Sequence, residues 1–202
     1  MNVLLFVGFL GSGKTSILMP LARFLVARED GGFDKTSVVI IENEIGEVAI
    51  DDAVLRREGL NVRELFGGCV CCQLTADLVS CLNEIAADIN PGCVMVEVTG
   101  LGIPQRIVDT INRYGRGIEN VVTVAVVDAE RWYELVEVLE PLVTKQVEGA
   151  DLVLVNKIDL IDEAGLLALK ESLGGINSSA PVLSVSATTG ISQDVLREVA
   201  GV

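Results

Sequence analysis

The sequence predicts an α/β protein in which a mostly parallel sheet is covered by helices on both faces. Short, wholly apolar runs alternate with longer stretches of helical periodicity, as in repeated strand and helix units. The apolar runs lack polar alternation, which is typical of strands buried on both faces. A chain of 202 residues with 50% hydrophobic content can form one sizeable core, so we expect a single domain over residues 1–202.

Each element follows from its local pattern. Strands are expected at the apolar runs 3–7, 37–41, 93–98, 121–127, 151–155 and 181–185. Helices are expected in the periodic stretches 14–28, 76–89, 103–113, 130–147, 162–173 and 191–200. Pro141 should break the fourth of these helices, because proline removes a backbone donor.

The charge balance argues against nucleic acid as a partner. A net charge of -14 would repel a phosphate backbone, whose binding proteins normally carry a basic surface.

Apolar runs stay shorter than the roughly 20 residues of a membrane helix, and the first run has no preceding lysine or arginine. We therefore expect a cytoplasmic protein without a membrane partner. In the cytoplasm thiols stay reduced, so the five cysteines do not suggest a disulfide framework.

A phosphate-binding motif lies between the first predicted strand and the first predicted helix. The stretch "GFLGSGKTS" fits G-x-x-x-x-G-K-[ST] in the context that this pattern requires. Glycines let backbone N–H groups turn around phosphates, Lys14 reaches the β/γ-phosphates, and the Thr15 hydroxyl can ligate Mg²⁺. The alternative, an ordinary glycine turn, does not need the lysine or the threonine. We therefore predict a P-loop NTPase whose phosphate-binding residues are Gly8, Gly11, Ser12, Gly13, Lys14, Thr15 and Ser16.

A base-recognition motif, "NKID" at 156–159, directly follows an apolar run. Asp159 can accept hydrogen bonds from guanine N1–H and the exocyclic amine, a donor pair that adenine lacks. Asn156 can bond the O6/N7 edge, and the stem of Lys157 can lie along the base plane. Alone, the pattern also fits a solvated strand end, but open α/β sheets bind ligands at this position, which favours GTP. A backbone N–H at 186–187 can meet guanine O6, so the predicted base-binding residues are Asn156, Lys157, Asp159, Ser186 and Ala187.

Glu97 places a carboxylate near the end of the run at 93–98. Beside a phosphate loop, such a carboxylate can bind Mg²⁺ through water or orient the attacking water. The alternative is a surface acid at a strand edge, since acidic residues are common there. We predict that Glu97 and Lys14 are catalytic.

The segment "IENEIGEVAIDD" carries five carboxylates, at Glu42, Glu44, Glu47, Asp51 and Asp52. Charge runs are usually solvated faces, which is one reading of this segment. In P-loop proteins, however, this place belongs to loops that sense the γ-phosphate and Mg²⁺. These carboxylates would repel one another and the phosphates unless a cation offset them, which suggests that the segment binds a second metal.

Three thiols, those of Cys69, Cys71 and Cys72, crowd together on a stretch that we expect to be a loop. A redox dithiol is one reading, although such a motif should open a helix without a phosphate loop upstream. Three inert buried thiols are another. Thiolates that select Zn²⁺ or Co²⁺ explain the clustering best, with Glu or water completing the site because the chain has no histidine. Cys81 and Cys93 are expected to be structural.

Taken together, "GFLGSGKTS", "IENEIGEVAIDD", "GGCVCC", "EVTGL", "VVDA" and "NKID" resemble the CobW-type proteins, a branch of metal-associated GTPases that includes HypB and UreG. The resemblance spans about residues 3–190. It implies GTP hydrolysis coupled to delivery of a transition metal (Zn²⁺, Co²⁺ or Ni²⁺) to a client metalloprotein. The residues that it implies as metal ligands are Cys69, Cys71, Cys72, Glu42 and Glu47, with Thr15 as the ligand of Mg²⁺.

The sequence also departs from the CobW pattern. CobW-type proteins usually continue into a smaller C-terminal domain and often carry histidine-rich stretches, neither of which we find in this sequence. HypB and UreG are dimers with metal between subunits, so the resemblance allows a homodimer by analogy. Two other functions remain open: a GTPase that guards or activates a corrinoid (cobalamin) enzyme, and a non-catalytic metal sensor that binds GTP.

Overall fold

The computed structural model of the chain describes residues 1–27, 38–42, 61–64, 71–98 and 100–201. A parallel sheet of seven strands lies at the centre of this described part, in the order β3-β2-β4-β1-β5-β6-β7. Its strands are β1 (Asn2–Val7), β2 (Val38–Glu42), β3 (Asn61–Glu64), β4 (Cys93–Glu97), β5 (Asn120–Asp128), β6 (Leu152–Asn156) and β7 (Val182–Ser184).

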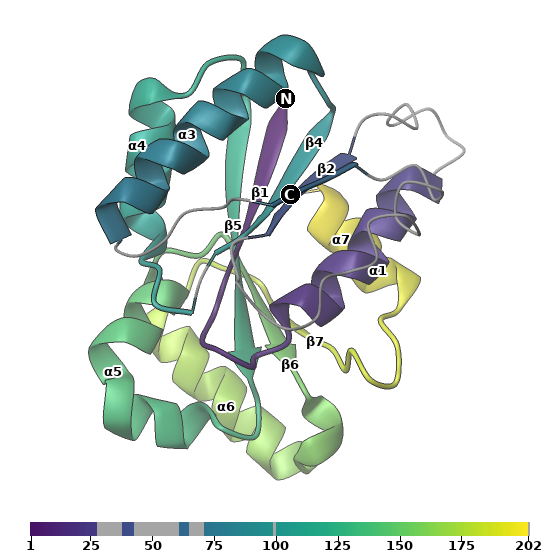
Figure 1. Cartoon of the computed structure of the whole chain (residues 1–202). Coiled ribbons are helices and arrows are strands. Elements are labelled where there is room, and N and C mark those ends of the chain that lie inside the picture. The colour runs from purple at the N-terminus through teal and green to yellow at the C-terminus, as the bar shows by residue number, and fades with distance from the viewer. Residues whose placement is uncertain (28–37, 43–60, 65–70, 99, 202) are drawn as a thin grey trace.

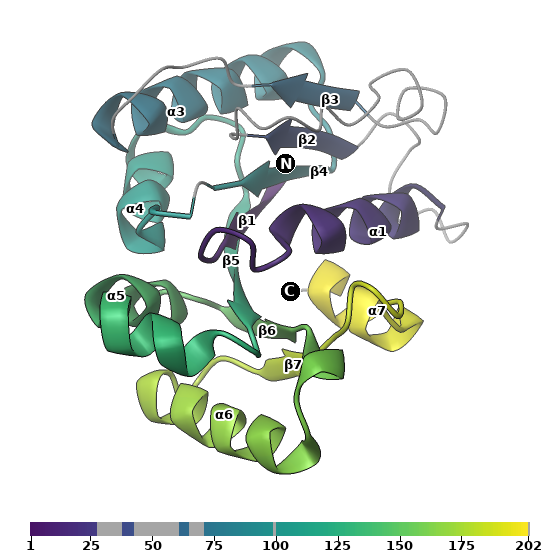
Figure 2. The same ribbon diagram turned by 60° about the horizontal axis from the view of Figure 1, so that its bottom comes forward.

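Helices cover both faces of the sheet, as Figures 1 and 2 show. One face carries α1 (Lys14–Ala27) and α7 (Gln193–Gly201). The other face carries α3 (Cys71–Asp88), α4 (Pro104–Tyr114), α5 (Trp132–Glu148) and α6 (Glu163–Ile176). A short 3-10 helix, η1 (Ile158–Leu160), follows β6. The predicted α/β fold class is confirmed.

The two faces of the sheet form two separate apolar cores. Along β1, Leu4 and Phe6 pack with α1 and α7, whereas Val3, Leu5 and Val7 pack with the helices of the other face. Alternate residues of one strand therefore enter different cores, and each of these five side chains is at most 4% exposed. This explains why the strands read as continuous apolar runs in the sequence.

Three features differ from the sequence expectations or refine them. The strand β3 was not expected, because "NVRE" contains a single apolar residue and no alternation. Helix α3 begins at Cys71, five residues before the expected start at 76. Helix α5 is bent, as expected from Pro141, but its non-helical residue is Leu139. None of the helices in the described part is long and apolar enough to cross a membrane.

The strand register brings the functional motifs to one edge of the sheet. Phe6 lies opposite Glu97, and Asp128 lies opposite Asn156. Because all strands are parallel, the loops that follow β1, β4, β5 and β6 leave the sheet at the same edge. The phosphate loop therefore lies near the chain segments that follow three other strands.

Two turns at the opposite edge are joined by one buried side chain, that of Asn177. Its Nδ2 donates to the carbonyl oxygens of Val147 and Ala150, both at 2.9 Å. Its Oδ1 accepts from the N–H groups of Ser179 and Ala180, both at 3.1 Å. The amide thus links the turn before β6 to the turn before β7.

We predict that Asn177→Ala lowers the free energy of unfolding by about 1–3 kcal/mol, because buried carbonyl groups lose their donor. Urea unfolding followed by circular dichroism measures this loss. The control is Asn112→Ala on an exposed position of α4, where we expect a change within about 0.5 kcal/mol. Equal effects of the two substitutions would show that the Asn177 amide does not stabilise these turns.

Candidate functional site

The phosphate loop adopts a conformation that two of its glycines make possible. Gly8 has φ +146° and Gly13 has φ +91°, values that side-chain-bearing residues rarely adopt. A Cβ on Gly8 would also collide with the carbonyl oxygen of Val126, and one on Gly13 with the Nδ2 of Asn156. The close approach of Val126 and Asn156 therefore requires glycine at both positions of the loop between β1 and α1.

Lys14 begins α1 and its side chain turns back into the phosphate loop. Its Nζ donates to the carbonyl oxygen of Gly8 at 3.1 Å, and the residue is only 3% exposed. A buried ammonium so close to the start of the loop adds positive charge where the helix dipole is also positive. The loop is therefore suited to an anion.

A hydroxyl and a carboxylate meet beside Lys14. The Oγ1 of Thr15 donates to Glu97 Oε1 at 3.0 Å and Oε2 at 2.8 Å. Glu97 is 4% exposed, at the end of β4. Both side chains offer the hard oxygen ligands that Mg²⁺ prefers, and Mg²⁺ sites commonly combine one or two carboxylates with substrate phosphates. The donor set at this position fits Mg²⁺.

The side chain of Asn156 connects three segments of the chain. Its Nδ2 donates to the carbonyl oxygen of Ser12 at 2.8 Å, and its Oδ1 accepts from the N–H of Ala187 at 3.0 Å. The residue is 2% exposed, so these bonds are shielded from water. In this structure both ends of the amide, and the N–H of Ala187, bond to protein groups. Asn156 thereby fixes the phosphate loop to the segment that follows β7.

Asp128 lies in the "VVDA" stretch of the family resemblance, but sequence reasoning gave it no role in the site. Its Oδ2 forms an ion pair with Lys157 Nζ at 2.6 Å, while its Oδ1 accepts from the N–H groups of Glu130 and Arg131 at 3.1 and 3.3 Å. Lys157 has a left-handed backbone with φ +64°. An acidic residue at the end of an apolar strand, like Glu97, was the signal in the sequence that could have indicated Asp128.

A surface pocket of about 400 Å³ lies at the ends of β6 and β7. Asp159 and Ser186 line it, so two residues predicted to hold the base lie at one pocket. The Asp159 carboxylate is exposed and can accept hydrogen bonds. The Oγ of Ser184, also in the lining, is buried and has no hydrogen-bond partner among the described residues. The exposed Asp159 carboxylate thus offers hydrogen-bond acceptors to a ligand in the pocket.

Gln146 fixes the loop that follows β4, a role that its place in the helix sequence did not reveal. Its Nε2 donates to the carbonyl oxygens of Gly100 and Gly102, at 3.0 and 3.1 Å. Gly100 in turn packs against the phosphate loop, where a Cβ would come within 2.7 Å of the backbone nitrogen of Leu10. A side chain on α5 therefore holds a segment that touches the phosphate loop.

The predicted transition-metal ligands are only partly within the described residues. Cys69 and Glu47 lie outside them, as does most of the acidic segment. Glu42 ends β2, and Cys71 and Cys72 begin α3, so the expectation of a loop at these two cysteines is wrong. Because these cysteines do begin a helix, the expected lack of a helix no longer argues against a redox dithiol. The phosphate loop upstream remains the one argument against it. Within the described ranges no group of three or more His, Cys, Asp or Glu residues could hold a metal ion.

Cys93 lies on β4 with its thiol in the core. Burial raises the pKa of this thiol to about 12, so the thiol stays protonated at neutral pH. A protonated, buried thiol is a poor metal ligand, because metals bind the thiolate. This agrees with the expectation that Cys93 is structural.

The chain is similar to a known protein family and to named relatives. The family model "CobW/HypB/UreG, nucleotide-binding domain" matches residues 2–184. The zinc chaperone CobW of Sinorhizobium sp is 30% identical over 87% of this chain and 56% of its own length. The zinc chaperone YjiA of Escherichia coli is 30% identical over 91% of this chain and 57% of its own length. The chain thus spans a little over half the length of these relatives.

One solved structure shows the same arrangement. The crystal structure of Zn(II)-bound YjiA GTPase from Escherichia coli superimposes with a TM-score of 0.65 and 28% sequence identity. The match covers 100% of this chain and 62% of that chain. The P-loop NTPase fold of the described elements is therefore shared with a GTPase.

We predict that Asp128→Asn destabilises the protein, because Lys157 loses its partner while the backbone contacts keep an oxygen acceptor. Asp128 is 2% and Lys157 29% exposed, so we expect a loss of about 1–2 kcal/mol, less than the about 3–5 kcal/mol of a fully buried pair. Urea unfolding measures it. Asp194→Asn removes the exposed ion pair with Arg197 and should change stability by less than about 1 kcal/mol. If both substitutions lower the free energy of unfolding by the same amount, the Asp128–Lys157 pair stabilises the protein no more than an exposed pair does.

Proposed function

The chain belongs to the CobW/HypB/UreG family of nucleotide-binding domains, and from this premise we propose that it hydrolyses GTP and couples hydrolysis to the binding and delivery of a transition metal. Its clients would be metalloproteins of the cytoplasm, where thiols stay reduced and can ligate metals. The proposal has a nucleotide part and a metal part, which are supported by different residues.

One observation carries the nucleotide part: the contact of Asn156 with both Ser12 and Ala187. It joins the phosphate loop to the two segments that we predict to hold guanine, across 144 residues of sequence. Asp159, exposed at the pocket beyond β6, would accept the two hydrogen bonds that guanine donates. The phosphates would lie against the backbone of Gly8, Gly11, Ser12, Gly13, Lys14, Thr15 and Ser16.

Hydrolysis of GTP at this site depends on positioning and charge. Lys14 would donate to the β/γ-phosphates, and its burial keeps the ammonium fixed where negative charge increases. Thr15 and Glu97 would hold Mg²⁺, which when bound supplies positive charge to the phosphate oxygens. Glu97 would also orient the attacking water, a role supported by its carboxylate lying within hydrogen-bond distance of Thr15 in the first turn of α1.

The metal part is supported by the relatives and by the place of three ligand candidates. Two relatives are named zinc chaperones, which favours Zn²⁺ over Co²⁺ or Ni²⁺ as the cargo. Glu42 ends β2, and Cys71 and Cys72 begin α3, at the same edge of the sheet as the phosphate loop. We propose as ligands Cys69, Cys71, Cys72, Glu42 and Glu47. A nucleotide-dependent change at this edge would then alter metal affinity.

We predict that Lys14→Ala lowers GTP turnover by about a hundredfold or more, because a fixed positive charge on the transferring phosphoryl group is lost. Phosphate release measures turnover, and circular dichroism checks that the fold persists. Lys145→Ala, at an exposed position of α5, removes the same charge away from the loop and should leave turnover unchanged. Turnover that survives Lys14→Ala would place the nucleotide elsewhere. A chain that binds GTP but never hydrolyses it would instead be a GTP-dependent metal sensor.

We predict that Co²⁺, as a coloured substitute for Zn²⁺, binds more tightly with a non-hydrolysable GTP analogue than with GDP. Titration into anaerobic, reduced protein with Mg²⁺ should show thiolate-to-cobalt absorption that Cys71→Ser and Cys72→Ser weaken and Cys81→Ser preserves. Metal should change nucleotide affinity by the same factor that nucleotide changes metal affinity. Equal Co²⁺ affinity in both states would refute the coupling. A complete lack of these bands would assign the thiols to redox chemistry or to contact with a partner such as a corrinoid enzyme.

A further inference from the structure

The side chain of Arg131 lies beside the phosphate loop. Its guanidinium carbon is 6.0 Å from the centroid of the Phe9 ring. Its Nη1 is 3.9 Å from the position that a Cβ on Gly11 would occupy. Phe9 and Gly11 both belong to the phosphate loop, so a second cation lies beside the loop in addition to Lys14.

The backbone of Arg131 is held in place from two directions. Its N–H donates to Asp128 Oδ1 at 3.3 Å, and its carbonyl oxygen accepts from the N–H of Leu135 at 2.9 Å in the first turn of α5. Asp128 also holds Lys157 through its other oxygen. The side chain therefore extends from a fixed backbone, and its guanidinium forms a cation–π contact with the Phe9 ring. Because the side chain is already partly ordered, it loses less conformational entropy when it binds a ligand.

The charge of Arg131 is not neutralised within the described part of the chain. There its guanidinium has no hydrogen bond or ion pair, whereas Lys157 is paired with Asp128. The protein carries a net charge of -14, and Glu97 adds a buried carboxylate beside the loop. A triphosphate brings more negative charge than Mg²⁺ and Lys14 together offset. The side chain of Arg131 is partly buried, and its guanidinium has donors arranged for bidentate contact with phosphate oxygens. It is suited to offset the negative charge that remains.

We propose that Arg131 binds the terminal phosphates of the nucleotide in the phosphate loop and stabilises the charge that develops on them during hydrolysis. This inference rests on the proposed function. In the reaction, the oxygen of water bonds to the γ-phosphorus, and the bond from that phosphorus to the bridging oxygen breaks. The electron pair of this bond passes to the β-phosphate. One proton of the water stays on the attacking oxygen, and the other passes to another oxygen of the released phosphate. Arg131 donates hydrogen bonds to the phosphate oxygens and keeps its own protons.

A purely structural role for Arg131 makes a different prediction. If the guanidinium only supports the loop through Phe9, its loss should weaken every nucleotide equally and lower the thermal midpoint. A phosphate contact should instead weaken nucleotides according to the number of their phosphates. Comparison of GTP, GDP and GMP therefore separates the two roles.

The experiment compares Arg131→Ala and Arg131→Lys with the unaltered chain, by calorimetric titration with a non-hydrolysable GTP analogue, GDP and GMP. We expect Arg131→Ala to lower the affinity for the GTP analogue by about tenfold to a hundredfold, the cost of a charge-assisted hydrogen bond. The loss should be smaller for GDP and absent for GMP. GTP turnover should fall as well, and Arg131→Lys should recover part of both because it keeps the charge without the bidentate geometry.

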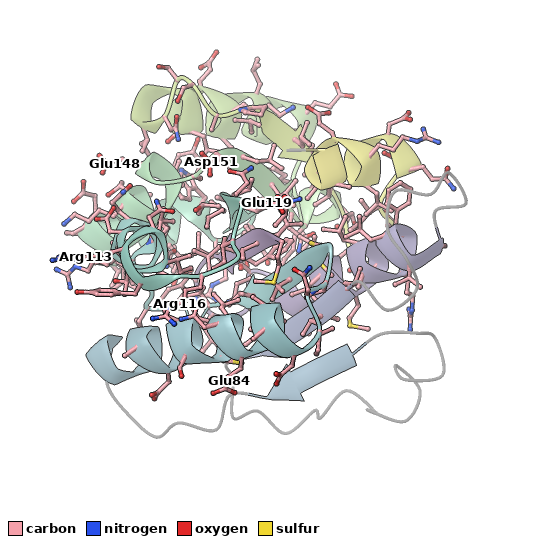
Figure 3. The ribbon with its side chains drawn as sticks, turned by 90° about the horizontal axis from the view of Figure 1, so that it is seen from above. Glu84, Arg113, Arg116, Glu119, Glu148 and Asp151 are labelled. Atoms are coloured by element: carbon pink, nitrogen blue, oxygen red, sulfur yellow. The ribbon has the colours of Figure 1, made fainter. Side chains whose placement is uncertain are left out.

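Arg116→Ala is the matched control, because it removes the same charge at the opposite edge of the sheet. Arg116 lies between α4 and the start of β5, and Figure 3, seen from the edge at which the strands begin, shows it at that edge. It should leave affinity and turnover unchanged. Unchanged affinity for the GTP analogue in Arg131→Ala, or equal losses for all three nucleotides, would overturn the inference.

The same titrations separate this inference from the proposed function. If the unaltered chain binds ATP rather than GTP, the proposed guanine preference fails, and the Arg131 comparison is read with a non-hydrolysable ATP analogue, ADP and AMP. A graded loss in that series would still support the phosphate contact. If the chain binds neither nucleotide, both proposals are refuted.

Discussion

The close packing of Asn156 against Gly13 is the contact on which the candidate site depends. A Cβ at position 13 would collide with the Asn156 amide, so the glycine leaves room for a side chain from β6 as well as for the turn of the loop. The amide then reaches Ser12 on one side and Ala187 on the other. Buried amides that use both donor and acceptor in this way fix geometry, because each lost bond would leave a desolvated group unpaired. The position of the phosphate loop relative to the segments that we propose to hold the base follows from this contact.

A second buried group, the carboxylate of Asp128, organises another part of the site. Burying a carboxylate is costly unless it is well bonded, and Asp128 accepts from two backbone N–H groups and one ammonium. Those bonds fix both Lys157 and the backbone of Arg131. Two cations on different elements thus take their positions from a single acidic residue, and a loss at this residue would disturb both of them together.

Local patterns in the sequence predicted much of this arrangement. Six of the seven strands of the described part, the helices around them and the phosphate loop follow from apolar runs, helical periodicity and glycine spacing, all of which act over a few neighbouring residues. The strand β3 was missed because the composition of "NVRE" does not indicate a strand. The segment is extended because it pairs with β2 at the side of the sheet. The contacts of Asn156, Asp128 and Gln146 could not be predicted, because they depend on which segments the folded sheet brings together.

The sequence distance bridged by Asn156 also has a consequence for how the protein is made. Ser12 and Asn156 are 144 residues apart, so the bond between them forms only after β6 has joined the sheet. During synthesis the phosphate loop leaves the ribosome long before its partner segment exists. A nascent chain could bind phosphates weakly through the loop alone, but it could not select a base. If the chain selects guanine as proposed, this selectivity arises as one of the last events in the biosynthesis of the domain, and it would report that folding is complete.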